Sequence, residues 1–595
     1  MTSGKIVDQC QRLLWLLVVS LVLSGCGGGG SNGKAPVDAN PAIKTPPNPD
    51  HGSDFGETDI GSDEPNATLD DWLRNVIMEN GLTGDPATPR QQRQRTPSED
   101  PKIKLGQLLF FSHSLSGDLT SSCATCHTPD FGGSDALSLG IGVAPVDAAK
   151  VGPVRRLDST KDLDPAADRG PNMHRNSQTI FNSALFDRSM SFDGRVFVED
   201  ENVVAGGKGQ AIRTPESGNF PDSSDADGIL EIFVKFPLTN HNEMRAYLFS
   251  AKSQEEYREY LAARLRGEQD EGMLSANGPE NWLQRFRQGF DQPQASALEV
   301  ITLINIQRAL AEYIQSMIFI ESPWKRYVEG NDHAISLSSK RGARLFFEPI
   351  DEGGLGCTSC HSGDFFTNEG FYNVAFPQIG RGFMRAEKDD IGRWASTRRE
   401  EDRYAFRVPS LLNVEVTMPY GHAGTFDLLQ DAIRYHANPR QGIQDYDFTL
   451  ASLAQFQGTQ SYGYALSHSQ SALNASSFSI AEALLPGRAL TNQEVSDLAS
   501  FLHTLTDDCV KNHTCRNQWV PSLNDDPDGN LLVSGINPTA EPITPLDPPT
   551  DDNELPAQPG DYPKTVDLNF TAQARSTFAE IEYCSDYPSH STINI

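Results

Sequence analysis

Cationic side chains are scarce in this chain. Lysine and arginine together number 49 against 80 aspartates and glutamates, which gives a formal net charge of −31. Such a surface repels phosphate groups, so the charge argues against nucleic acid and against an anionic membrane surface as partners. It suits a basic protein partner, although solubility alone explains a charge of this sign at least as often.

Long hydrophobic runs are also lacking. The apolar run 13–23 follows Lys5 and Arg12 and is too short to cross a bilayer as a helix, which is typical of a secretory signal. The stretch "LSGC" at its end resembles a bacterial lipobox, and Cys26 would then be the lipidated first residue of the mature chain. Ordinary signal cleavage beside a chance cysteine is the alternative.

The predicted N-terminal organisation follows from this pattern. Residues 1–25 form a lipoprotein signal peptide, and residues 26–67, rich in Gly and Pro, form a flexible linker. We therefore expect an exported bacterial lipoprotein on the periplasmic side of the membrane, at the outer membrane or on the cell surface. Its only membrane contact would be the lipid anchor.

Cysteine is scarce as well, with nine in 595 residues, yet four of the nine form two Cys-x-x-Cys-His motifs. From the composition, chance gives about 0.003 such motifs per chain. A shared zinc site is excluded because the motifs lie far beyond finger spacing. Two thiols that add to haem vinyl groups, followed by a proximal histidine, fit instead. The predicted cofactors are two covalent haem c groups, held by Cys123, Cys126 and His127 and by Cys357, Cys360 and His361.

Three further cysteines lie near the C-terminus. Cys509 and Cys515 are close enough in sequence to close a small disulfide loop, which would leave Cys584 odd. The sequence does not decide the pairing, and Cys584 remains a possible partner.

The segments before the two motifs repeat each other. "KLGQLLFF" at 104–111 and "KRGARLFF" at 340–347 share Lys, Gly, Leu and Phe-Phe at the same places, with helical apolar spacing. We therefore predict a mainly α fold with two cytochrome c-like haem domains. Their limits are 68–332, opening with the helix "DWLRNVIMEN", and 333–519, closing with "LTNQEVSDLASFLHTL". Residues 520–595 form an acidic, Pro-rich tail.

Several motifs occur in an order that points to one family. "ALFDRSMSFDGR", "FPLTNHNEM" and "AFRVPSLLNVEVTMPYGHAG", with the closing helix, resemble the bacterial dihaem cytochrome c peroxidase family over roughly residues 100–505. That family includes the methylamine-utilisation enzyme, which uses peroxide to oxidise tryptophans of another protein. The resemblance implies a peroxidatic haem in the N-terminal domain and an electron-transfer haem in the C-terminal domain.

The resemblance also implies catalytic residues beside the first haem. The family's distal glutamate falls on Glu243 and its neighbouring proline on Pro237. A carboxylate in a dry pocket can move a proton between the peroxide oxygens. Two alternatives stay open: Glu243 is a solvated residue at a helix start, or His241 shares its role.

The chain departs from the family near the first haem. Many peroxidases carry a capping histidine where Val143 stands, so we expect an open iron, with His174 as the alternative ligand. Phe192 replaces the family tryptophan between the haems, and Phe233 replaces a glutamine. An acidic insertion, 199–230, could be a lid or a docking loop.

A distal ligand of the second haem is predicted in the helix after "PYGHAG". His436 stands where classical members have Met and the methylamine-utilisation branch has Tyr, and it shares a helix face with apolar residues. His422 and Met418 are the alternatives. The family's calcium ion would be bound by the Asn176 side chain and by the carbonyls of Thr417 and Pro419.

These residues predict a dihaem peroxidase-type oxidoreductase. It would react with hydrogen peroxide at the open first haem and oxidise a protein or organic substrate through the second. The alternative is a cytochrome c peroxidase that takes electrons from a small cytochrome c or cupredoxin. Further alternatives are a non-enzymatic electron carrier and the oxygen-dependent polymer cleavage of the related dihaem rubber oxygenases.

Overall fold

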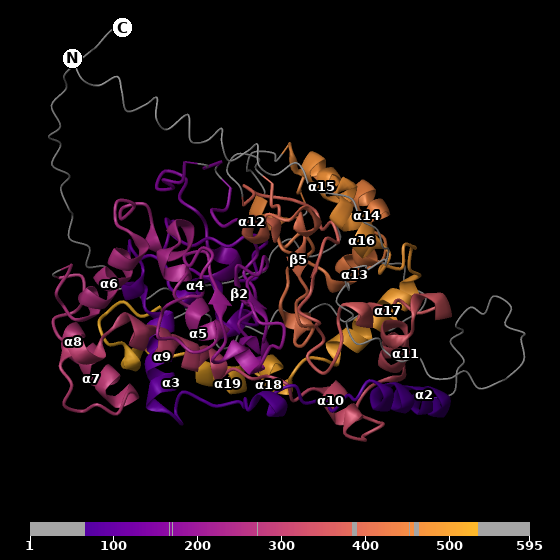
Figure 1. Ribbon diagram of the computed structural model, residues 1–595, viewed down its shortest axis with the longest axis horizontal. Coiled ribbons are helices and arrows are strands. Elements are labelled where there is room, and N and C mark those ends of the chain that lie inside the picture. Colours follow the sequence, from indigo (N-terminus) through magenta and orange to yellow (C-terminus); the bar gives the residue numbers. More distant parts are fainter. Residues whose placement is uncertain are drawn as a thin grey trace, which may run out of the picture. The chain divides into compact units, whose positions relative to one another are not determined.

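Helices carry most of the regular structure, and the strands are short (Figure 1). The computed structural model describes residues 66–532 apart from 166, 169, 271, 384–388, 452 and 457–462. The mainly α prediction is confirmed. The signal, Cys26, most of the linker, Cys584 and the tail beyond 532 lie outside the described residues. None of the described helices is long and apolar enough to cross a membrane.

The connections between the helices differ widely in length, and the longest lies between α4 and α5. In chain order they are α2 (Asn66–Glu79), α3 (Pro101–Phe111), α4 (Cys123–Cys126), α5 (Ile229–Phe233), α6 (Gln254–Leu265), α7 (Gly278–Gly289), α8 (Ala297–Val300), α9 (Leu303–Gln315), α10 (Pro323–Val328), α11 (Leu337–Phe347), α12 (Trp394–Thr397), α13 (Leu429–Ala437), α14 (Pro439–Asp445), α15 (Ala465–Asn474), α16 (Ser476–Glu482), α17 (Asn492–His503), α18 (Asp508–Lys511) and α19 (His513–Arg516).

The two repeated segments form equivalent helices. Asp100 caps the N-terminus of α3, because its side chain accepts from the Lys102 backbone N–H, and α3 packs on α9. α11 packs in the same way on α17, which begins with the predicted Thr491 capping box. Both predicted helices are confirmed.

The glycine shared by the repeats explains the close packing of each pair. A Cβ on Gly106 of α3 would lie 1.9 Å from the Ala309 carbonyl oxygen of α9. A Cβ on Gly342 of α11 would lie 1.9 Å from the Asp497 carbonyl oxygen of α17. Only a residue without a side chain lets these backbones approach so closely.

The predicted domains, residues 68–332 and 333–519, are the first and second halves of the described chain. Each end of the described chain packs against the half that is more distant from it in sequence. α2 contacts α11, and its Asp70 accepts from Tyr327 Oη at 2.7 Å and pairs with Lys340. The C-terminal segment contacts the first half, where the Leu532 N–H donates to the Phe111 carbonyl at 2.8 Å. The domain limits stay predictions, and the packing adds that ordered contacts continue past residue 519.

The strands build two small antiparallel sheets. β1 (Ser189–Met190), β2 (Val196–Val198) and β3 (Ile212–Arg213) pair in that order, with Ser189 opposite Phe197 and Val198 opposite Ile212. β4 (Phe371–Tyr372) pairs with β5 (Phe406–Arg407). The Arg407 N–H at β5 donates to the Phe192 carbonyl near β1, so the two sheets meet.

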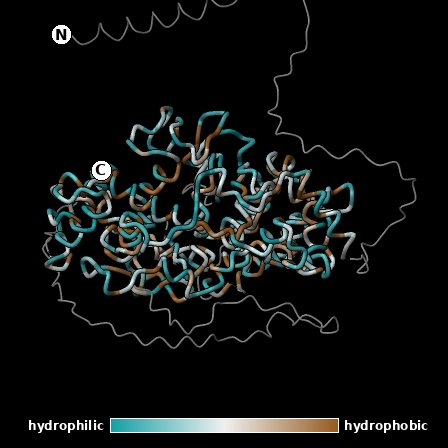
Figure 2. Tube along the Cα trace, turned by 90° about the horizontal axis from the view of Figure 1, so that it is seen from below, coloured by the Kyte–Doolittle hydropathy of each residue, from teal (hydrophilic) through white to brown (hydrophobic). Residues whose placement is uncertain are grey.

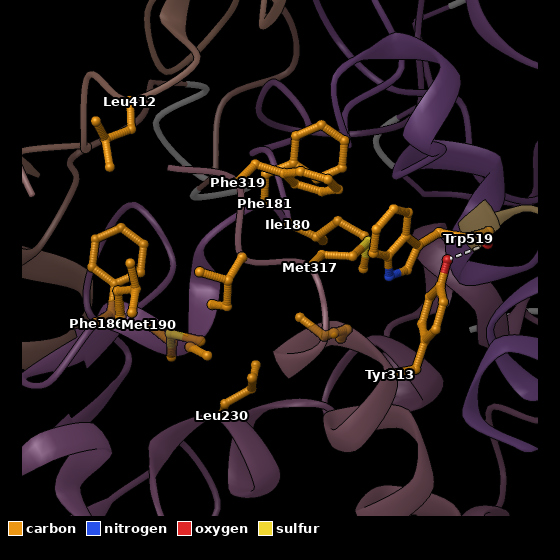
Figure 3. Packing of buried hydrophobic residues seen from close by; sticks show 14 of the residues in the cluster. Ile180, Phe181, Phe186, Met190, Leu230, Tyr313, Met317, Phe319, Leu412 and Trp519 are labelled. Atoms are coloured by element: carbon orange, nitrogen blue, oxygen red, sulfur yellow. Dashed lines mark hydrogen bonds between the residues drawn. The ribbon is translucent and has the colours of Figure 1, made fainter. Parts of the chain in front are cut away.

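Among the described residues, one large hydrophobic core and two smaller clusters surround these elements. Apolar and hydrophilic stretches alternate along the same segments, as amphipathic elements require (Figure 2). Phe181 packs on Phe319 with ring centroids 4.6 Å apart, and Phe319 packs on Trp519 at 5.0 Å (Figure 3). The Tyr313 hydroxyl donates to the Trp519 carbonyl at 2.8 Å, which fixes the C-terminal segment against α9. The Cys509–Cys515 disulfide lies just before this tryptophan.

Candidate active site

One cavity of about 700 Å³ connects the two predicted haem positions. Both motifs line it, and most of the remaining wall is apolar. The structure therefore brings residues from widely separated segments to one space. The predicted residues on this wall are Cys123, Cys126, His127, His174, Asn176, Phe192, Phe233, Pro237, Glu243, Cys357, Cys360, His361, Thr417, Pro419, His422 and His436.

The first motif forms a single helical turn, α4. Ser122 and Thr125 make a capping box at its start, and His127 ends it with Nδ1 3.4 Å from the Gly133 carbonyl. Burial raises the pKa of Cys123 to about 12 and raises the pKa of Cys126 further, which keeps both thiols protonated in the protein alone. Burial lowers the pKa of His127, so the imidazole is neutral, the form that ligates metals.

Glu243 lies in a single π-helical turn, His241–Arg245, which contacts the segment just before this motif. The Asn240 side chain caps the turn by accepting from the Glu243 N–H at 3.3 Å, and Ser121 Oγ donates to the Glu243 carbonyl at 3.0 Å. Burial raises the pKa of Glu243, and the Arg195 charge opposes the shift. The carboxylate is near enough to Cys123 to raise the pKa of that thiol.

The neighbouring histidine faces elsewhere. His241 Nδ1 lies 2.8 Å from the Ala246 carbonyl, and the ring stacks on Tyr247 at 4.8 Å. It is absent from the cavity wall in the described part of the chain. The geometry therefore favours Glu243 over His241 as the group that faces a ligand.

The segment that lacks the family's capping histidine packs behind the Glu243 turn. Val143 is buried, and its N–H donates to the Asn242 carbonyl at 3.1 Å. His174 does line the cavity, with its ring edge-on to Phe383 at 5.9 Å and its Nδ1 without a hydrogen-bond partner among the described residues. His174 therefore stays an alternative ligand.

The second motif faces α13 across the cavity. His361 Nδ1 lies 3.1 Å from the Phe366 carbonyl. Burial lowers the pKa of His361 to about 4, and repulsion from the His436 imidazole lowers it as well. The two imidazoles are therefore close enough to interact electrostatically. Burial lowers the pKa of His436 to about 4 as well. Helix α13 thus presents His436 toward the second motif.

The two alternative ligands have other surroundings. His422 stacks on Phe406 with centroids 4.0 Å apart, and its charged neighbours are Asp390 and Arg175. Met418 is absent from the cavity wall within the described residues. The geometry favours His436, and iron ligation itself stays a prediction.

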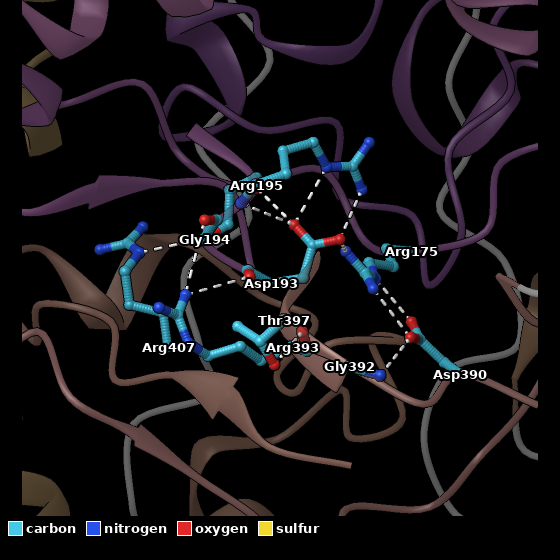
Figure 4. A network of polar contacts seen from close by, with 10 residues as sticks. Arg175, Asp193, Gly194, Arg195, Asp390, Gly392, Arg393, Thr397 and Arg407 are labelled. Carbon is cyan, nitrogen blue, oxygen red and sulfur yellow. Dashed lines mark hydrogen bonds and ion pairs between the residues drawn. The ribbon is translucent and has the colours of Figure 1, made fainter. Parts of the chain in front are cut away.

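An arginine cluster is made of Arg175, Arg195, Arg393 and Arg407 (Figure 4). All of these except Arg393 line the cavity. Arg175 pairs with Asp390 at 2.5 Å and with Asp193 at 2.9 Å, and Arg195 pairs with Asp193 at 3.0 Å. Sequence reasoning missed this cluster, because no periodicity or spacing marks a buried guanidinium.

Arg407 is the least compensated member of the arginine cluster. It is 5% exposed, its Nε donates to the Ser191 carbonyl at 3.2 Å, and its Nη1 has no hydrogen-bond partner among the described residues. Burial lowers the pKa of Arg407 to about 10, and Glu369 is the one charge that opposes this. A buried guanidinium of this kind calls for an acceptor from a bound group.

The wall fits haem c at both ends. Each end offers two neighbouring thiols, a neutral imidazole and apolar side chains, and Arg407 offers an unsatisfied donor to a carboxylate such as a haem propionate. The donor set therefore agrees with the cofactor that the two motifs predict.

The structure also shows where the other residues that depart from the family pattern lie. Phe192 and Phe233 line the cavity. Within the insertion 199–230, Pro215 lines it too, and Asp222 pairs with Lys235 at 2.6 Å, both nearly buried. The insertion is thus docked beside the Glu243 side of the cavity.

Of the three predicted calcium residues, Asn176 contacts the segment that follows the other two. The Asn176 N–H donates to the His422 carbonyl at 2.9 Å, and Asn176 Nδ2 donates to the Leu137 carbonyl at 2.8 Å. Thr417 and Pro419 line the cavity, as Asn176 does. No cluster of three His, Cys, Asp or Glu side chains suited to a metal occurs among the described residues.

Known proteins share this sequence pattern. Residues 100–333 match the family model described as di-haem cytochrome c peroxidase. The chain is 26% identical to cytochrome c peroxidase Ccp of Escherichia coli (strain K12), over 67% of this chain and 68% of the relative. It is 26% identical to methylamine utilization protein MauG of Methylophilus methylotrophus, over 56% and 72%. A crystal structure of a MauG-like protein associated with microbial copper homeostasis is 20% identical over 71% and 92%, with a TM-score of 0.44.

Proposed function

The chain belongs to the di-haem cytochrome c peroxidase family, and from this premise we propose which of its residues do the work. The family implies two haem c groups and a peroxidase-type oxidoreductase. We infer that Cys123, Cys126 and His127 hold the haem that meets hydrogen peroxide. A second haem would be held by Cys357, Cys360 and His361, with His436 on its other face. The substrate oxidised through it is a protein or organic molecule.

The observation that carries this proposal is the place of Glu243. Its carboxylate faces the same cavity as the first motif and interacts electrostatically with both thiols of that motif. Burial raises its pKa, which moves the carboxyl group toward the range useful for proton transfer at neutral pH. Pro237, on the same wall, closes the space beside it.

The chain's own residues supply the proton chemistry. When bound, the first haem supplies an iron that takes peroxide as a ligand and passes electrons to it. The Glu243 carboxylate accepts the proton of the peroxide oxygen nearer the iron and returns it to the outer oxygen, which leaves as water. Phe192, Phe233 and Pro237 keep competing solvent away from that proton.

The overall reaction balances with a two-electron donor. Peroxide takes up two electrons and two protons to give two waters, and an organic substrate with two hydrogens to lose supplies both. His436 favours this direction, because a second imidazole, unlike Met, does not raise the potential of a haem. A low potential makes the second haem a poor acceptor for an ordinary high-potential cytochrome.

A cytochrome c peroxidase is the alternative reading. The relatives include cytochrome c peroxidase Ccp and cytochrome c551 peroxidase of Pseudomonas aeruginosa, whose names state that activity for those proteins. In that case electrons would enter at the second haem from a small cytochrome c or cupredoxin.

Steady-state peroxide consumption distinguishes substrate oxidation from the cytochrome c peroxidase alternative. The fully oxidised protein is mixed with peroxide, with and without reduced cytochrome c. Under our proposal the haem spectrum changes without any prior reduction, and cytochrome c adds little turnover. Fast cytochrome c oxidation would favour the alternative. No spectral response to peroxide and no peroxide consumption, with or without reduced cytochrome c, would overturn both.

We further propose one calcium ion at the junction of the halves, bound by the Asn176 side-chain oxygen and the Thr417 and Pro419 carbonyls. Its support is that all three residues line the cavity, and that the Asn176 N–H donates to the carbonyl of His422, close in sequence to Pro419. Hard oxygen ligands suit calcium. Removal with a chelator should change the haem spectra reversibly, and elemental analysis that finds no calcium would exclude the ion.

We also propose that the protein is exported as a lipoprotein, lipidated at Cys26 and held on the periplasmic side of the membrane. The support is the short apolar run and "LSGC". Palmitate labelling should be lost in Cys26→Ala. Retained labelling would remove the anchor.

A further inference from the structure

A guanidinium from the second half is buried among carboxylates of the first half. The Arg381 side chain is 1% exposed and pairs with Asp162 at 2.6 Å, with Asp164 at 3.4 Å and with Asp168 at 3.0 Å. Its Nη2 also donates to the Gly170 carbonyl at 2.9 Å. Arg381 belongs to the predicted segment 333–519 and its partners to 68–332, so these contacts cross between the halves.

One of the three carboxylates also touches the catalytic turn. Asp164 Oδ2, which faces Arg381, accepts a hydrogen bond from Asn242 Nδ2 at 2.9 Å. Asn242 directly precedes Glu243 and is 4% exposed. Its Oδ1 accepts from the Tyr247 hydroxyl at 3.2 Å, so both ends of the Asn242 amide are held.

The other contacts of the turn come from the first half. Asn240 caps it, Ser121 holds the Glu243 carbonyl, and Val143 donates to the Asn242 carbonyl. A Cβ on Gly142 would lie 2.0 Å from that same carbonyl, so the backbone behind the turn is in close contact with it. The Asp164 contact links this fixed turn to the second half.

We propose that Arg381 is a positioning residue for Glu243, acting through Asp164 and Asn242. The inference rests on the proposed catalytic role of Glu243. Arg381 neutralises Asp164 where the charge is shielded from water, and this keeps the Asp164 carboxylate available to Asn242. Through this contact the second half helps to fix where the Glu243 carboxylate stands in the cavity.

The chain offers a matched pair of variants to test the inference. The side chains of Asp162 and Asp164 are 3% and 1% exposed and pair with the same guanidinium, but it is Asp164 that accepts the hydrogen bond from Asn242. Asp164→Asn and Asp162→Asn are isosteric and remove the same charge. A purely structural role of the ion pairs predicts similar effects, whereas positioning predicts an effect on Glu243 in Asp164→Asn alone.

The readout is the cyanide affinity of the oxidised holoprotein, measured by optical titration without turnover. Hydrogen cyanide binds a ferric haem as the anion and leaves its proton on a nearby base, so the affinity reports where the Glu243 carboxylate stands. We expect the cyanide affinity of Asp164→Asn to fall by about tenfold or more, since displacing a reacting group by an ångström can cost about a hundredfold. Asp162→Asn should stay within about twofold of wild type. Asn242→Ser, which leaves the Arg381 ion pairs intact, should match Asp164→Asn.

Each outcome decides between the claims. Equal affinities in Asp164→Asn and Asp162→Asn, with a clear loss in Glu243→Gln, would overturn the positioning role alone. An unchanged affinity in Glu243→Gln would overturn the role of Glu243 and the positioning with it. If Asp164→Asn fails to incorporate haem, a normal affinity in Asn242→Ser would also overturn the inference.

Discussion

The Val143 N–H donates to the Asn242 carbonyl at 3.1 Å, immediately behind Glu243. Val143, which stands where the resemblance places a capping histidine, is therefore a buried apolar residue that braces the turn that carries Glu243. With no imidazole there, we predict that the first haem is open in the oxidised protein. Electron paramagnetic resonance should show high-spin ferric haem. Two low-spin signals without a high-spin one would indicate a ligand such as His174, which His174→Ala would then identify.

Glu243→Gln should retain both haems and lose roughly a hundredfold to ten-thousandfold of its peroxide reactivity, the usual range for a general acid–base group. Because burial raises the pKa of Glu243, and the ionised carboxylate accepts the first proton, the wild-type rate should fall as pH drops through that raised pKa. Stopped-flow spectra across pH measure both effects. His241→Ala is the control, since its ring faces away from the cavity, and a comparable loss there would reassign the role.

Much of the architecture was readable from the sequence, because it rests on local patterns. The repeated helices, the Thr491 capping box and the two Cys-x-x-Cys-His motifs carry their own periodicity or spacing. The arginine cluster and the Arg381 contacts were not readable, because they join segments hundreds of residues apart by charge pairing that no local pattern encodes. The crossing of the chain ends was hidden for the same reason: α2 has the pattern of any amphipathic helix, and tertiary packing alone selects α11 as its partner.

His436→Ala should leave both haems attached and turn the second one from low-spin to high-spin. The reason is that α13 presents His436 toward His361 in the cavity. Optical and paramagnetic resonance spectra of the oxidised variant measure this change, and the wild type should lack the Met–iron absorption band. His422→Ala, which removes a ring stacked on Phe406, should stay low-spin. The reverse pattern would transfer the ligand to His422.

Gly342→Ala should destabilise the second half of the described chain. The new methyl would lie 1.9 Å from the Asp497 carbonyl oxygen, so α11 and α17 must separate. Overpacking of this kind costs about 1–3 kcal/mol of unfolding free energy. Urea unfolding of the holoprotein measures the loss. Gly463→Ala is the matched control, because nothing lies within 4 Å of its added methyl, and an equal loss there would contradict the packing argument.

Arg407→Met should lower the reduction potential of a haem beside it. Reduction adds negative charge, and a buried guanidinium that pairs with a haem propionate stabilises the reduced form. Arg407 suits this role because its Nη1 lacks a partner among the described residues, whereas Arg175 is paired with two aspartates. A shift of about 60 mV corresponds to a tenfold change in a one-electron equilibrium, and we expect a shift of that order.

Spectroelectrochemical titration measures this shift. Infrared difference spectra with haem labelled with ¹³C at the propionate carboxyls show whether the carboxylate bands move. Arg393→Met is the control, because Arg393 stacks on Phe371 at 3.7 Å and is absent from the described cavity wall. Equal shifts in both variants, with propionate bands unmoved, would mean that Arg407 acts only as a distant charge.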